Sequence, residues 1–146
     1  MMPKRKLYLF SLFMVIPLLF TAGCTSTESD GLEDVTWALE QYGEKGNLND
    51  VIEGSTVTAT FDSQEDRLQG SAGCNHYFGG YEVNKEKLSI SQIGSTEMYC
   101  MDPEGVMDQE QDFLQILQKA ESYRVDGNEL RIDCGDSELV FISTGE

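Results

Sequence analysis

Apolar side chains recur at every second residue in most segments of this chain between positions 35 and 142. That period puts one set of side chains on a single face of a β-strand, so it predicts strands with one buried face. Polar or glycine-containing turns separate the segments, and Asp126-Gly127-Asn128 is typical of a hairpin turn. We expect strands over residues 35–42, 56–61, 67–72, 77–83, 88–92, 93–99, 123–125, 130–132 and 138–142, with a turn over 43–49.

One segment has a different period. Apolar residues recur three and four positions apart from Val106 through Phe113 to Leu117, which predicts an amphipathic helix. We expect it to cover residues 103–122, with Asp102 as its N-cap and Pro103 in its first turn. The fold class is therefore α+β, with mostly antiparallel strands and one amphipathic helix packed against the open face or end of the sheet.

The first 23 residues are typical of an export signal. Lys4, Arg5 and Lys6 precede an apolar run over 7–20, and small residues follow directly before Cys24. The run of about 14 residues is shorter than the roughly 20 needed for a membrane-spanning helix, which makes a permanent transmembrane anchor the weaker reading. We expect a signal peptide over 1–23, a polar tether over 24–33 and one folded domain over 34–143.

Residues 21–24, Thr21-Ala22-Gly23-Cys24, resemble the bacterial lipobox, although leucine is usual where Thr21 stands. The resemblance implies that Cys24 carries lipid and becomes the first mature residue, which anchors the protein in a membrane. We therefore expect a lipid-anchored protein of the cell envelope that faces the extracytoplasmic side. The alternative is a secreted protein cut near Ala22 or Gly23 with Cys24 unmodified.

The charge balance excludes one class of partner. The chain has 26 acidic and 10 basic residues, a net charge of −16, and loss of the three basic residues of the signal would leave −19. Such a surface repels nucleic acid and anionic lipid head groups. We expect no nucleic-acid binding. The oligomeric state has no signal in the sequence.

The cysteines and the single histidine suggest three chemistries. If lipid occupies Cys24, three cysteines remain, which allows one disulfide and one free thiol. Cys74 and His76 form a nucleophile-and-base pair in the alternative reading, an envelope enzyme. Zinc binding by Cys74, His76, Cys100 and Cys134 lacks a paired-cysteine spacing, and residues 126–129 lack a full calcium loop. We expect no catalytic residue, no metal and no cofactor.

Aromatic side chains supply the remaining candidate site. Core packing is the simpler reading for most of them, but the mouth of a half-open barrel can also hold an apolar ligand. The alternative is a groove for an envelope protein or an apolar ligand, formed by Trp37, Tyr42, Tyr77, Tyr81 and Tyr99.

The order of several motifs resembles the META domain family. The most specific are Gly73-Cys74-Asn75-x-Tyr77 and Thr96-x-Met98-x-Cys100, followed by Gln109-Glu110-x-x-Phe113-Leu114. The resemblance covers residues 34–142, and it rests on the order and spacing of the motifs together.

This resemblance implies a curved antiparallel sheet or a small, partly open β-barrel with one helix packed against it. It also implies a disulfide between Cys74 and Cys100, which leaves Cys134 free; a pairing of Cys134 with one of the other two is the alternative. Members of the family are linked to heat response, antibiotic tolerance and secretion. We therefore expect a non-catalytic binding or stress-support module.

Overall fold

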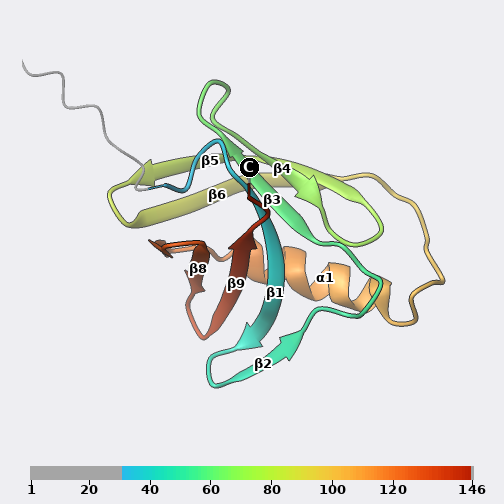
Figure 1. Cartoon of the computed structure of the whole chain (residues 1–146). Coiled ribbons are helices and arrows are strands. Elements are labelled where there is room, and N and C mark those ends of the chain that lie inside the picture. The colour runs from blue at the N-terminus through green and yellow to red at the C-terminus, as the bar shows by residue number, and fades with distance from the viewer. Residues whose placement is uncertain (1–30, 146) are drawn as a thin grey trace, which may run out of the picture.

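The computed structural model describes residues 31–145, which form nine β-strands and one α-helix (Figure 1). The predicted signal and Cys24 lie outside the described residues. Among the described residues, no helix is long and apolar enough to cross a bilayer. The elements are β1 (Thr36–Glu44), β2 (Asn47–Asp50), β3 (Thr58–Asp62), β4 (Arg67–Ser71), β5 (His76–Asn84), β6 (Lys87–Ser95), α1 (Val106–Leu117), β7 (Ser122–Asp126), β8 (Glu129–Cys134) and β9 (Ser137–Ser143).

The strands form one antiparallel sheet that curls almost into a ring. Their order is β2-β1-β3-β4-β5-β6-β7-β8-β9, and β1 also pairs with β9. On one edge of β1, the first part pairs with β3 and the last part with β2, while the other edge pairs with β9 and so joins the two ends of the sheet. The ring is weakest between β6 and β7, which pair only at Lys87 and Ser122. The predicted antiparallel sheet with one helix is confirmed.

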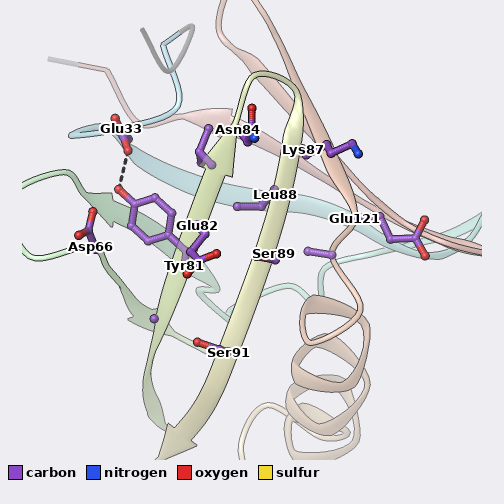
Figure 2. Close-up of a pocket in the computed structure, with 13 residues that line it drawn as sticks. Glu33, Asp66, Tyr81, Glu82, Asn84, Lys87, Leu88, Ser89, Ser91 and Glu121 are labelled. Atoms are coloured by element: carbon purple, nitrogen blue, oxygen red, sulfur yellow. Dashed lines mark hydrogen bonds between the residues drawn. The ribbon is translucent and has the colours of Figure 1, made fainter. Parts of the chain in front are cut away.

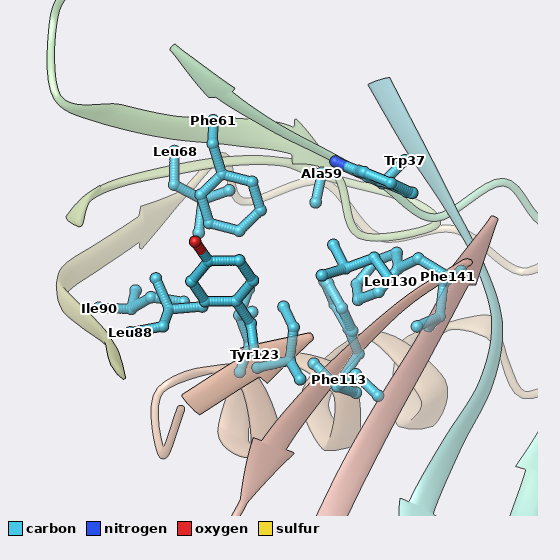
Figure 3. Packing of buried hydrophobic residues seen from close by; sticks show 14 of the residues in the cluster. Trp37, Ala59, Phe61, Leu68, Leu88, Ile90, Phe113, Tyr123, Leu130 and Phe141 are labelled. Atoms are coloured by element: carbon cyan, nitrogen blue, oxygen red, sulfur yellow. The ribbon is translucent and has the colours of Figure 1, made fainter. Parts of the chain in front are cut away.

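The core lies inside this ring and is capped by the helix. Figure 3 shows side chains from many strands converging there, as the period-two pattern requires. Phe113 enters from α1 and meets two aromatic rings edge-on, Tyr77 with centroids 5.5 Å apart and Phe141 with centroids 6.4 Å apart. The helix therefore contributes directly to the core instead of covering a finished sheet.

The strand predictions fail in two places. Residues 47–50, predicted as part of a turn, form β2 and pair with the end of β1. Residues 88–92 and 93–99 are not two strands, because β6 runs unbroken from Lys87 to Ser95 and then stops. A bulge lies between the pairs Phe78–Gly94 and Gly80–Ser91, with Gln92 at a φ of 53°. The bulge changes which side chains face the core, so the apolar alternation in the sequence breaks there and predicts two strands where there is one.

The predicted helix is too long at both ends. It begins at Val106 after Gly105, whose φ of 85° suits glycine, and not at Pro103 with Asp102 as cap. The Asp102–Pro103 peptide is cis. After Leu117 the turns tighten, since Lys119 and Ala120 donate to carbonyls three residues back. Glu121 then donates to the Asp133 carbonyl, and the chain continues as β7.

The ordered fold begins earlier than the predicted domain boundary. Leu32, assigned to the tether, is fully buried, and its carbonyl accepts a hydrogen bond of 2.9 Å from the Trp37 indole. The last residues of the predicted tether therefore belong to the folded domain.

Replacement of Phe113 by alanine should destabilise the domain. The side chain is fully buried and joins the helix to two strands, so its loss removes burial and leaves a cavity. We expect a loss of about 3–5 kcal/mol in the free energy of unfolding, measured by urea denaturation. Phe78→Ala, at a ring that is 45% exposed, is the matched control and should cost much less. Equal losses for the two variants would contradict the role of Phe113.

Candidate functional site

Three polar side chains are buried in the part of the chain that the structure describes: Asn75, Gln109 and Glu110. Asn75 precedes β5, and the other two lie in the first turns of α1. Each of them bonds to a segment distant in sequence. Buried polar groups need such partners, because an unpaired one costs about 1–3 kcal/mol.

Glu110 holds the turn between β4 and β5. Its Oε2 accepts the backbone N–H groups of Cys74 at 3.1 Å and Asn75 at 2.7 Å. Its Oε1 accepts the Asn75 side-chain amide at 2.7 Å. Three N–H donors converge on this carboxylate, and together they lock the helix to the Gly73-Cys74-Asn75 turn.

Asn75 extends this network to the segment after β6. Its Oδ1 accepts the Thr96 hydroxyl at 2.8 Å and the Met98 N–H at 2.7 Å, while its Nδ2 also donates to the Met98 carbonyl at 3.0 Å. These bonds end the pairing of β6 and turn the chain outward. The Asn-x-Tyr and Thr-x-Met motifs are therefore two sides of one contact.

Gln109 does the same for the segment before β3. Its Oε1 accepts the Ile52 N–H and its Nε2 donates to the Ser55 hydroxyl, both at 2.7 Å. The first turns of the helix thus fix three connecting segments at once. This arrangement is structural, since the bonding atoms are buried and already paired.

The disulfide between Cys74 and Cys100 closes the same region, with an S–S distance of 2.01 Å. Cys74 is therefore no free nucleophile in this structure, although the enzyme reading requires a thiolate there. His76 lies next to it on β5 with an exposed side chain. Cys134 is free and buried in β8. The zinc reading needs all four of these residues together, and two of its sulfurs are bonded to each other. No group of acidic, histidine or cysteine residues within 31–145 is arranged to hold a metal ion.

The loop between β6 and α1 exposes large apolar side chains. Met98, Tyr99 and Met101 are 54%, 79% and 83% exposed, although the disulfide and the Asn75 bonds hold their backbone. Exposed apolar side chains on a fixed backbone are typical of contact surfaces. Figure 1 shows this loop at the far side of the molecule from the first described residues.

The five aromatic residues of the predicted groove do not come together. Trp37, Tyr42, Tyr77 and Tyr81 are buried within the ring, whereas Tyr99 lies on the exposed loop. Tyr77 donates its hydroxyl to the Thr58 carbonyl, which satisfies its polar end inside the core. The five residues therefore do not form one groove, although Tyr81 and Trp37 each line a separate hollow.

A large open hollow lies against the β5–β6 hairpin (Figure 2). Its volume is about 1080 Å³, and Glu33, Asp66, Glu82 and Glu121 stand around it with Lys87 as the one basic residue. Tyr81 donates its hydroxyl to Glu33 at 2.7 Å. Burial, with the neighbouring Glu33 carboxylate, raises the pKa of Tyr81, so its hydroxyl remains a donor. The hollow therefore presents negative potential.

A second hollow lies between β6 and α1. Its volume is about 490 Å³, and Ile93 of β6 faces Leu114 of the helix across it. Gln111, Leu114, Gln115 and Gln118 line it from one helical face, and Ser95 and Lys119 complete the lining. Met107 lies one turn before Gln111 on that face and accepts the Cys100 N–H through its sulfur at 3.4 Å. The exposed loop and this groove therefore adjoin.

Sequence reasoning did not find this groove. Its residues are three glutamines, a serine, a lysine and two aliphatics, a composition that resembles any solvated helix face. The signal present was the sequence Gln92-Ile93-Gly94, which breaks the alternation of β6 at the bulge beside the groove.

Comparison with known proteins decides the family. The META domain matches residues 30–146, which is most of the chain. The protein belongs to the META domain family. No curated protein sequence matches this META protein at a significant level.

Solved structures support the same fold. An NMR structure of a protein from Burkholderia xenovorans is 24% identical with a TM-score of 0.68, and the match covers 99% of this chain and 100% of that one. The crystal structure of a DUF4847 family protein from Bacteroides vulgatus is 15% identical with a TM-score of 0.58 and covers 76% of this chain and 93% of its own. Because both sequence identities are below 25%, these similarities show only that this META protein shares the fold of those structures.

Replacing Glu110 by glutamine tests the buried network. The glutamine side chain would bring its NH₂ group to face the donors that the carboxylate now accepts, among them the Asn75 side-chain NH₂. Asn75 cannot rotate its own amide to compensate, because its Oδ1 already accepts two hydrogen bonds. We expect the variant to lose about 1.5–3 kcal/mol of unfolding free energy in urea denaturation. Glu104→Gln makes the same chemical change at an exposed site and should lie close to wild type. An unchanged stability for Glu110→Gln would refute the proposed role of the carboxylate.

The thiol of Cys134 should be inert in the folded protein. Burial raises its pKa to about 12, so at pH 8 it is protonated and shielded. Iodoacetamide at pH 8 should label no cysteine within residues 31–145 of the native protein and Cys134 alone in urea. After reduction in urea, Cys74 and Cys100 should react as well. Labelling of Cys74 in the native, unreduced protein would contradict the disulfide.

Proposed function

We propose that this META protein is a lipid-anchored, non-catalytic binding protein of the cell envelope. The observation that carries the proposal is the disulfide between Cys74 and Cys100. Structural disulfides persist in oxidising compartments and are rare in the cytosol. An export signal that ends in a lipobox-like Cys24 agrees with that location.

The non-catalytic part rests on the state of the candidate nucleophile. Cys74 is bonded to Cys100, and its backbone N–H is held by Glu110. A thiol enzyme needs an activated free cysteine with a base in reach. The buried polar side chains of the region, Asn75, Gln109 and Glu110, are hydrogen-bonded within the fold, which supports a structural role for them.

The binding part rests on the surface that the network supports. The disulfide and the Asn75 bonds hold the exposed loop at Met98–Met101 in one backbone conformation. A preorganised apolar surface loses less entropy on binding than a mobile one. The loop lies far from the first described residues, which follow Cys24 in the sequence (Figure 1).

Replacing Cys24 by serine tests the anchor. We expect the wild-type protein to sediment with membranes and to carry the mass of a diacylglyceryl group on a chain that begins at Cys24. The Cys24→Ser variant should lack both properties, because a hydroxyl cannot take the thioether-linked lipid. Intact-mass spectrometry and membrane fractionation are the measurements.

Thr25→Ala is the control variant, since it changes the next residue and leaves the cysteine. It should remain in the membrane fraction with unchanged lipid mass. A wild-type protein of unmodified mass that retains Met1 would reject the lipoprotein proposal. Cleavage after Ala22 or Gly23 without added lipid would favour the secreted form instead.

A further inference from the structure

Strand β6 has a free edge along most of its length. It pairs with β5 from Lys87 to Ser95, but with β7 only at Lys87, beside which the Leu88 N–H donates to the Glu121 carbonyl. No other strand of the described chain lies against that second edge. Peptide groups at such an edge can pair with an additional strand.

Helix α1 lies beside this edge but does not supply the backbone hydrogen bonds that a neighbouring strand would supply. Gln118 donates its side-chain amide to the Ile90 carbonyl at 3.0 Å, which satisfies one edge acceptor. The groove of about 490 Å³ opens between helix and strand from Ile93 onward. Ile93 and Leu114 give it apolar surface, and its polar rim carries amides together with Ser95 and Lys119. Such a groove can receive an apolar side chain and backbone groups together, and Lys119 places one positive charge at it, so the basic side chains of a ligand belong at the acidic hollow and not in the groove.

Charge indicates which peptide would enter. The acidic hollow lies against the same strand, since Ser89 and Ser91 of β6 line it and Glu121 joins it from the end of the helix. Glu82 and Glu121 are exposed, and Lys87 is the only basic residue of that hollow. A chain with a net charge of −16 adds a long-range attraction for cations.

We propose that an extended, basic peptide segment of a partner protein adds as a strand to the free edge of β6. One apolar side chain of the segment occupies the groove between Ile93 and Leu114. Its basic side chains reach the acidic hollow beside the β5–β6 hairpin. This is strand addition, in which backbone hydrogen bonds supply affinity and the pocket supplies selectivity. The inference names the partner class of the binding protein proposed above.

A lipid surface fits these features less well. The carboxylates of the acidic hollow repel anionic head groups, and lipid tails make no use of peptide N–H and C=O groups. A small apolar ligand would fill the groove but leave the edge and the carboxylates unused. The peptide alone uses all three features.

The test uses the mature full-length protein in non-ionic detergent and a fluorescein-labelled ten-residue peptide of alternating lysine and valine. We expect saturable binding by anisotropy, with slowed hydrogen exchange at backbone amides between Ile90 and Ser95. A peptide of the same side chains with alternate backbone nitrogens methylated should bind at least tenfold more weakly, because it cannot complete the strand pairing. A peptide of alternating glutamate and valine should also bind at least tenfold more weakly.

Two substitutions test where on the protein the peptide binds. Leu114→Lys puts a charge in the groove at a partly exposed position and should weaken binding at least tenfold, whereas the control Leu114→Met keeps an apolar side chain of similar size and should bind as wild type. Glu121→Gln should weaken binding severalfold and reduce its dependence on salt. Circular dichroism checks that each variant is folded.

Several results would overturn the inference. Equal binding of the methylated peptide would show attraction by charge without strand addition. Equal binding of the peptide of alternating glutamate and valine would show that the partner segment need not be basic. Protection of another strand, no binding at all, or binding to phosphatidylglycerol vesicles in place of the peptide would each reject it. None of these bears on lipidation of Cys24, so failure here and failure of the envelope proposal remain distinct.

Discussion

The contact between Glu110 and the turn before β5 is the interaction on which the rest of this structure depends. One buried carboxylate accepts three N–H groups, and Asn75 passes the constraint on to the segment after β6. Both oxygens of the carboxylate accept N–H groups, which compensates for its burial. Charge-assisted hydrogen bonds of this kind are about twice as strong as neutral ones. They place the helix so that Phe113 enters the core between two aromatic rings.

The position of the helix explains why the ring of strands does not close. α1 lies where the second neighbour of β6 would continue, and the tightened turns after Leu117 bring β7 to the sheet only at its start. The ring therefore has a seam, with a groove on one side and an acidic hollow nearby. The disulfide adds a covalent link between the turn at Cys74 and the exposed loop. One region of the described chain thus combines the buried hydrogen-bond network with the exposed side chains of Met98, Tyr99 and Met101.

The fold was readable from the sequence where the local pattern and the tertiary structure agree. Alternation at Val57, Ala59 and Phe61 shows a strand with one buried face, and the structure buries all three. The pattern misled where a tertiary bond intervenes: β6 ends because Asn75 captures Thr96 and Met98, and no local signal marks that contact. β2 was missed because Asn47–Asp50 is polar and takes its structure from pairing with β1. Motif resemblance identified Cys74, Asn75 and Cys100, but not that Glu110 joins them, which needs the folded backbone.

An open strand edge is a liability that proteins generally cover, twist away or charge, because it can pair with other chains. This protein uses only part of those defences at β6. The bulge near Gln92 twists the strand, and Gln118 covers one carbonyl, but the helix leaves a groove where it could have packed closely. Larger side chains at Gln111 and Gln115 would close that groove without disturbing Phe113, which lies on another face of the helix. The open seam is the feature on which the proposed strand addition rests.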